Sequence, residues 1–227
     1  MRSVVISSPG AGPGLHWSQA AAAELAALLA ADGCDVLWFA AVRPGQLPPP
    51  PPAGCEARVA LVPALPPLHR VAVDCTDLGL EQTLQRSLRE QPAEHVVHVG
   101  AGARGSPNLA WLADRMGSAA FAVVRAAEVV CQRGDLVDDR GAPCHDWLDP
   151  RRCRRCCAGG RWRQPPAEDF RSRSDLLAGS LLAARAVFVG DAADVAPLVA
   201  FGLPERSLVV ADPAAIAAAV RGLGSAR

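Results

Sequence analysis

The chain contains no lysine and no tyrosine, and only 4% of its 227 residues are aromatic. Its hydrophobic share is nevertheless 50%, so a sizeable core can form, and Ala, Leu and Val must fill most of it. Net charge is lacking as well: the formal charge is zero, which argues against a general binder of nucleic acid or of membrane surfaces. No window reaches about 18 uninterrupted apolar residues, so we predict no membrane span.

We also predict no export signal at the start of the chain. The opening MRSVVISSPGAG has one Arg and a very short apolar run before Gly and Pro, which makes a poor signal peptide. We therefore expect a cytoplasmic protein. In the cytosol clustered cysteines more often bind metal than form disulfides, and this chain has eight cysteines.

Short β-branched runs alternate with Ala/Leu-rich helical stretches along most of the chain. The patterns predict strands at residues 3–8, 34–40, 57–62, 69–74, 95–100, 120–125, 187–190 and 207–212. Asp191 and the pair Asp212–Pro213 are predicted helix starts. Alternating strands and helices are typical of a parallel sheet covered on both faces. We predict one Rossmann-like α/β domain over residues 1–227, interrupted by a Cys/Arg-rich insert at residues 131–163.

A Gly-rich stretch, SSPGAGPGLHW, follows the first predicted strand and precedes a predicted helix. Backbone N–H groups in such a loop can face an anion. The stretch does not match G-x-G-x-x-G, however, and no P-loop Lys follows it, so a turn that glycine permits explains it better than a dinucleotide site. Ligands bind at the carboxyl ends of the strands in these sheets, which makes Gly12, Gly14 and His16 candidate cleft residues.

The insert holds five of the eight cysteines, in CQRGDLVDDRGAPCHDWLDPRRCRRCC. Cys131, Cys144, Cys153 and Cys156 have the spacing C-x12-C-x8-C-x2-C, and the C-x2-C pair on one tight turn is a recurrent half-site for tetrahedral zinc. We predict a structural zinc that substitutes for the hydrophobic core the insert lacks. Disulfides, free thiols and a redox role stay open, and Cys157 could replace Cys156 as a ligand.

Arginines surround the cysteine pair in RRCRRCCAGGRWR. An Arg beside an aromatic residue can bind phosphate or stack on nucleic-acid bases. The same residues can equally form a solvated rim on a zinc knuckle. The arginines concerned are Arg151, Arg152, Arg154, Arg155, Arg161 and Arg163, which flank Trp162.

The stretches VVHVG, NLAWLADRM and AFAVVRAAEVVCQRGDLVDDRGAPC, with DPRRCRRCC, resemble the N-terminal domain of bacterial GT-B glycosyltransferases of the family-4 type. One group of that family carries V-x-L-H-D-Y-W-L-L-C-P-R-G-x-L, then G-x-x-C and P-x-x-C-x-x-C. The resemblance covers nearly the whole chain, and the cysteine run is its most specific part. Arg125 and Ala126 stand where the family has His-Asp.

The resemblance implies transfer of a sugar from a nucleotide donor to an acceptor, a glycan or a phosphate-bearing molecule, bound mainly by this N-terminal domain. The candidate cleft residues are then Gly12, Gly14, His16, His98 and Arg125. His98 is the one plausible base among them, although no catalytic residue is assigned.

The chain ends at Arg227, whereas the family continues into a C-terminal Rossmann domain that holds the nucleotide sugar. Transfer needs donor and acceptor held together, so we expect activity only with a donor-binding half as partner. A fragment of a longer protein and a degenerate domain are compatible with the same sequence. The alternative function is a non-enzymatic binding or scaffold module that uses the zinc knuckle and its Arg-rich rim.

Overall fold

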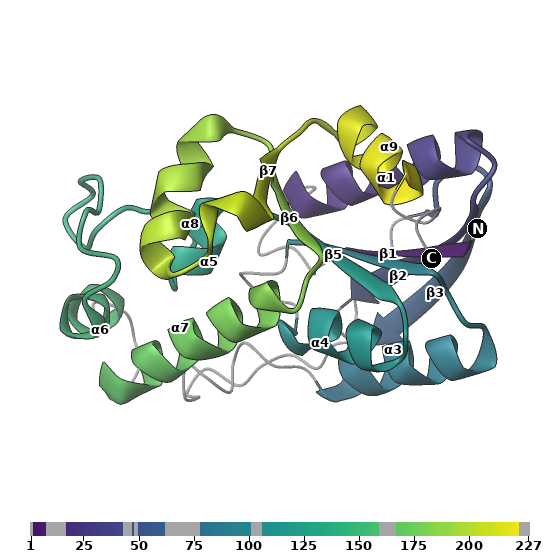
Figure 1. Ribbon diagram of the computed structural model, residues 1–227. Helices are drawn as coiled ribbons and strands as arrows, with labels where there is room; N and C mark the ends of the chain where they lie inside the picture. The colour runs from purple at the N-terminus through teal and green to yellow at the C-terminus, as the bar shows by residue number, and fades with distance from the viewer. Residues whose placement is uncertain are drawn as a thin grey trace.

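The computed structural model describes residues 2–7, 17–42, 47, 50–61, 78–100, 106–158 and 167–222. The strand predicted at residues 69–74 lies outside these ranges. Within them, strands and helices alternate along the chain (Figure 1). No helix of this part of the chain is both long and apolar enough to cross a membrane.

The described strands form one sheet in the order β3-β2-β1-β4-β5-β6-β7, and every neighbouring pair is parallel. They are β1 (Arg2–Ser7), β2 (Asp35–Val42), β3 (Cys55–Leu61), β4 (His95–Val99), β5 (Ala119–Val124), β6 (Ala186–Val189) and β7 (Leu208–Val210). This order confirms the Rossmann-like α/β fold. The direction of strand addition reverses between β1 and β4, the point where ligands bind in such sheets.

Helices cover both faces of the sheet (Figure 1). One face carries α1 (Trp17–Ala31) and α9 (Pro213–Gly222), which contact each other. The other carries α3 (Leu78–Glu90), α4 (Asn108–Arg115) and α7 (Ala167–Leu182). The remaining elements are α5 (Ala126–Val130), α6 (Pro150–Ala158), α8 (Val195–Phe201) and the 3₁₀ turns η1 (Ala192–Asp194) and η2 (Glu205–Ser207).

Two hydrophobic cores lie on the two sides of the sheet, because side chains alternate along each strand. In β4, Val97 and Val99 pack on the side of α1 and α9, whereas Val96 packs on the opposite side. The core on the α1–α9 side of the sheet contains the buried rings of Trp38, Phe121 and Phe188. The rings of Phe121 and Phe188 stack with their centroids 6.2 Å apart. Each buried ring removes a large apolar area from water, so these few residues stabilise the sheet disproportionately.

The described part of the insert, residues 131–158, consists of a loop followed by α6, which contacts α7. The start of α6 is fixed by Asp149, whose Oδ1 accepts the backbone N–H of Arg151 at 2.9 Å, with Pro150 in the first turn. The Cys153–Cys156 pair therefore lies on a helix, and the prediction of a tight turn was wrong. The prediction relied on the C-x2-C spacing alone, whereas Asp149 and Pro150 together provide a helix start.

We expect Phe188→Ala to lower the free energy of unfolding by about 3–5 kcal/mol, because it deletes a fully buried ring and leaves a cavity in the core. Denaturant unfolding followed by circular dichroism measures this. Leu78→Ala is the matched control, since Leu78 is 70% exposed and its truncation should stay within about 0.5 kcal/mol. Equal losses in the two variants would contradict this description of the core.

Candidate functional site

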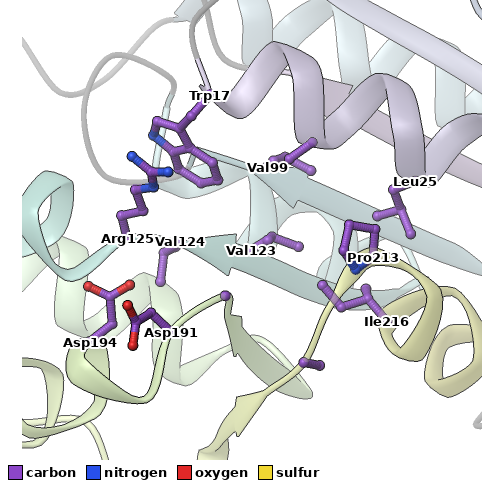
Figure 2. A pocket seen from close by; sticks show the side chains of 13 residues that line it. Trp17, Leu25, Val99, Val123, Val124, Arg125, Asp191, Asp194, Pro213 and Ile216 are labelled. Carbon is purple, nitrogen blue, oxygen red and sulfur yellow. The ribbon is translucent and has the colours of Figure 1, made fainter.

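A cavity of about 510 Å³ opens at the carboxyl ends of β4, β5, β6 and β7, and we call it the strand-end cavity (Figure 2). Its size falls within the range of about 300–1,000 Å³ that is usual for small-molecule sites. One part of its wall is apolar and is made by Leu25, Val99, Val123, Pro213 and Ile216. Figure 2 shows these side chains at one end of the cavity and the charged ones at the other.

Trp17 and Arg125 form one side of the charged end. Trp17 begins α1, and Arg125 is the residue between β5 and α5. The guanidinium carbon of Arg125 lies 4.9 Å from the centroid of the Trp17 ring, within the range of a cation–π contact. The contact holds an exposed positive charge at the mouth of the cavity.

Two carboxylates, those of Asp191 and Asp194, lie on the same side as Arg125 (Figure 2). Asp191 caps η1, as the sequence predicted for this residue, because its Oδ1 accepts the N–H of Ala193 at 2.9 Å. Asp194 Oδ1 accepts the N–H of Ala126 at 3.0 Å and so caps α5 from outside. Burial raises the pKa of Asp194 above its ordinary value, and Asp191 adds to this, whereas Ala126 and Arg125 oppose it.

Glu128 is a carboxyl-bearing residue buried on α5, and it is not among the residues that line the strand-end cavity. The indole N–H of Trp17 donates a hydrogen bond to its Oε1. Burial raises the pKa of Glu128 to about 7, with a smaller contribution from Asp194, while Trp17 and Arg125 lower it. At neutral pH this side chain is therefore close to half protonated.

The buried Arg173 of α7 holds the other end of α5. Its guanidinium donates to the backbone carbonyl of Val129 at 2.9 Å and to that of Glu128 at 3.0 Å. Both carbonyls belong to the last turn of α5, so Arg173 caps the C-terminal end of this helix. Helix α5 is thus fixed between the strand-end cavity and the insert.

The predicted cleft residues do not all lie in one place in the structure. Gly12, Gly14 and His16 lie outside the described residues. Arg125 is among the residues that line the strand-end cavity, and its role in binding stays a prediction. His98 is 1% exposed, and by the alternation along β4 it faces away from the side that Val99 gives to the cavity. Burial lowers its pKa to about 4, so its imidazole is neutral at pH 7, and its role as a base stays a prediction.

Sequence reasoning did not assign Trp17, Glu128, Asp191 or Asp194 to the site. Asp191 carried a usable signal, because a polar residue directly after a buried strand lies at the ligand-binding edge of a parallel sheet. The contact between Trp17 and Glu128 joins residues 111 positions apart, and no local pattern indicates it.

The four cysteines proposed as metal ligands line one cavity. With Cys157, they line a second cavity of about 10 Å³ in the insert, which we call the cysteine cavity: Cys131, Cys144, Cys153 and Cys156. Burial, then the thiolate forms of the neighbouring cysteines, raise the pKa of Cys153 to about 12. As their side chains are placed, no three His, Cys, Asp or Glu residues in the described ranges form a group that could hold a metal ion.

The arginines of the insert differ in their use. Arg152 points inward and pairs with the buried Asp138 at 3.0 Å, so it belongs to the fold of the insert. Arg151, Arg154 and Arg155 are exposed on α6. Arg161 and Arg163 lie outside the described residues.

Neither protein-family models nor the curated protein sequences give a match to this chain. Among solved structures, it is similar to the crystal structure of Arabidopsis thaliana UGT89C1 complexed with UDP, with 10% sequence identity and a TM-score of 0.41. The match covers 87% of this chain and 44% of that chain, so the chain spans less than half the length of the solved structure. Similarity at this level does not identify a function.

We expect Glu128→Gln to remove a pH dependence of stability. The pKa of Glu128 rises from 4.5 to about 7 on folding, so the folded protein keeps a proton that the unfolded chain releases between these pH values. The stability it contributes is complete below about pH 4.5 and is lost as pH rises through about 7. Relative to the neutral Gln variant, the wild type should therefore lose roughly 3 kcal/mol between pH 4 and pH 8, because one pKa unit corresponds to about 1.4 kcal/mol.

Urea unfolding of both proteins at a series of pH values measures this difference. Glu24→Gln, which changes an exposed carboxylate of α1, is the control and should follow the wild type. A constant difference between wild type and Glu128→Gln across the series would show that Glu128 ionises normally.

Proposed function

We propose that the chain is the acceptor-side domain of a two-domain glycosyltransferase and that its strand-end cavity binds a hydroxyl-rich glycan acceptor. The resemblance of the sequence to family-4-type N-terminal domains supports the reaction class. The observation that carries the proposal is the composition of the cavity, where Arg125, Asp191 and Asp194 face an apolar wall at the ligand-binding edge of the sheet.

This composition suits a sugar better than a phosphate. Ionised carboxylates only accept hydrogen bonds, and sugar hydroxyls supply donors. The apolar wall can pack against the C–H groups of a pyranose ring. The Trp17 indole, which also lines the cavity, can do the same where Arg125 does not cover it. Two carboxyl groups against one guanidinium give the cavity an excess of acidic groups, which disfavours a phosphate-bearing acceptor.

In this proposal Asp194 receives the proton of the attacking hydroxyl. Burial raises its pKa, and a carboxylate with a raised pKa is a stronger base than an ordinary one. Its Oδ1 is engaged with Ala126, which leaves Oδ2 as the oxygen that a hydroxyl could reach. The nucleotide sugar would be presented by a second, donor-binding domain, because transfer needs both substrates held in one geometry.

Saturation-transfer NMR with a panel of neutral oligosaccharides, and with their phosphorylated forms, tests acceptor binding. We expect binding of a neutral glycan, weakened about tenfold or more in Asp194→Asn, because a hydrogen bond to a charged group contributes about 1.5–3 kcal/mol. Asp175→Asn is the control, since Asp175 is exposed on α7 on the other side of the sheet. Preference for phosphorylated glycans, or equal binding by all three proteins, would contradict the proposed site.

Turnover is a separate experiment. The chain is mixed with a donor-binding half that retains its nucleotide sugar, and transfer to the bound glycan is followed by mass spectrometry. We expect transfer with both halves and none with either alone. Glycan binding without any transfer would instead identify a non-enzymatic binding module.

A further inference from the structure

The cysteine cavity has the size of a site for a single bare ion. Its volume of about 10 Å³ is close to the minimum of about 10–15 Å³ that one water molecule needs. Five thiols line it from three stretches of chain: Cys131 after α5, Cys144 in the loop, and the cysteines of α6. The seven described cysteines of the protein are all free thiols, so no disulfide joins these stretches.

The surrounding loop has an ordered backbone but little core. The buried carboxylate of Asp138 accepts the N–H groups of Arg140 and Ala142, each at 2.9 Å, and the guanidinium of Arg152 at 3.0 Å. Leu136 has a φ of 52°, a left-handed conformation that a bulky residue adopts only when its surroundings impose it. Of residues 131–157, whose side-chain burial the structure describes, Cys131 and Asp138 are buried, and only the first is apolar. A segment with so little buried apolar surface is usually stabilised by a disulfide or a bound metal.

We propose that Cys131, Cys144, Cys153 and Cys156 bind one Zn²⁺ as four thiolates, and that the ion fixes the insert in place of a hydrophobic core. Four protein ligands fill the tetrahedral shell of zinc and leave no position for water or substrate, so the role is structural. Binding converts four thiols into thiolates and releases four protons to solvent. This inference does not rest on the proposed glycan site.

Binding requires the cysteine side chains to move, because in the described residues no three of them, as placed, form a group that could hold a metal ion. In a tetrahedral Zn²⁺ site the Zn–S distances are about 2.3 Å, which places the sulfur atoms about 3.8 Å from one another. The thiols now make long contacts with carbonyl groups: Cys153 Sγ lies 3.6 Å from Trp147 O, and Cys156 Sγ lies 3.9 Å from Val137 O. Each sulfur is placed by a single side-chain torsion, so in the proposed site the cysteines rotate between staggered positions to reach the ion.

Cys156 is a better fourth ligand than its neighbour Cys157. The guanidinium of Arg133 donates an N–H to Cys156 Sγ at 3.9 Å, and such donors to ligand atoms are the usual outer contacts of metal sites. Arg133 is in turn held by the carboxylate of Asp135 at 3.1 Å. Cys157 lies one residue further along α6 and provides a matched control in the same cavity.

The test uses the whole chain, purified under reducing conditions without chelator and reconstituted with zinc sulfate. Native mass spectrometry and elemental analysis should give one zinc per chain for the wild type and for Cys157→Ser. Cys153→Ser and Cys156→Ser should lose the ion, while circular dichroism confirms that the sheet persists. Zinc retained in those two variants, zinc lost in Cys157→Ser with retention in Cys156→Ser, or a disulfide in place of zinc in the wild type would overturn the proposal.

Cobalt titration of the reduced, metal-free wild type gives a readout that does not depend on any variant folding. Four thiolates should produce intense sulfur-to-cobalt charge-transfer absorption and the visible bands of a tetrahedral ion. A weak spectrum of an octahedral ion would exclude the site. Chelation should also speed hydrogen exchange in residues 131–158 and leave β4 and β5 unchanged, and equal exchange in the insert before and after chelation would exclude the structural role.

Discussion

Helix α5 has only five residues, and its position depends on charged side chains that other elements supply. So short a helix is not stable on its own, because nucleation costs more than its few hydrogen bonds return. Asp194 satisfies its first N–H and Arg173 satisfies the carbonyls of its last turn. The indole N–H of Trp17, at the start of α1, donates a hydrogen bond to the side chain of Glu128. The strand-end cavity and the insert both begin at the ends of this helix, so both inherit its placement.

The sheet provides the rigid base on which α5 is held. Parallel strands buried on both faces place all their carboxyl ends at one edge, and residues that follow different strands meet there. Arg125 follows β5, and Asp191 and Asp194 come after β6, although more than 60 residues separate them in sequence. The polar groups of the cavity are thus a consequence of topology, while its apolar wall continues the core between the sheet and the α1–α9 layer.

Much of the fold could be predicted from the sequence because its strands are continuous apolar runs. The predicted strands at 95–100 and 120–125 correspond to β4 and β5, and the start of α9 at Pro213 was found from the Asp212 cap. Helices α5 and α6 were missed because they lack apolar periodicity and depend on caps, one of them from a distant residue. The cluster of cysteines followed from their spacing, but the helix that carries Cys153 did not. Trp17 and Glu128 could not be paired, since only the folded chain brings them together.

The two roles of Asp194 restrict how this protein can diverge. One oxygen of the carboxylate holds the backbone of α5, and the other is directed to whatever occupies the cavity in the proposed site. A substitution that removed the side-chain oxygen at this position would alter ligand preference and also release the helix, so folding and recognition both constrain this carboxyl group. The side chain of Arg125 differs from that of Asp194, because it is exposed and stacks on the indole ring of Trp17 rather than holding a helix backbone. Among descendants of this fold, new specificities should therefore arise first at position 125, with position 194 retained.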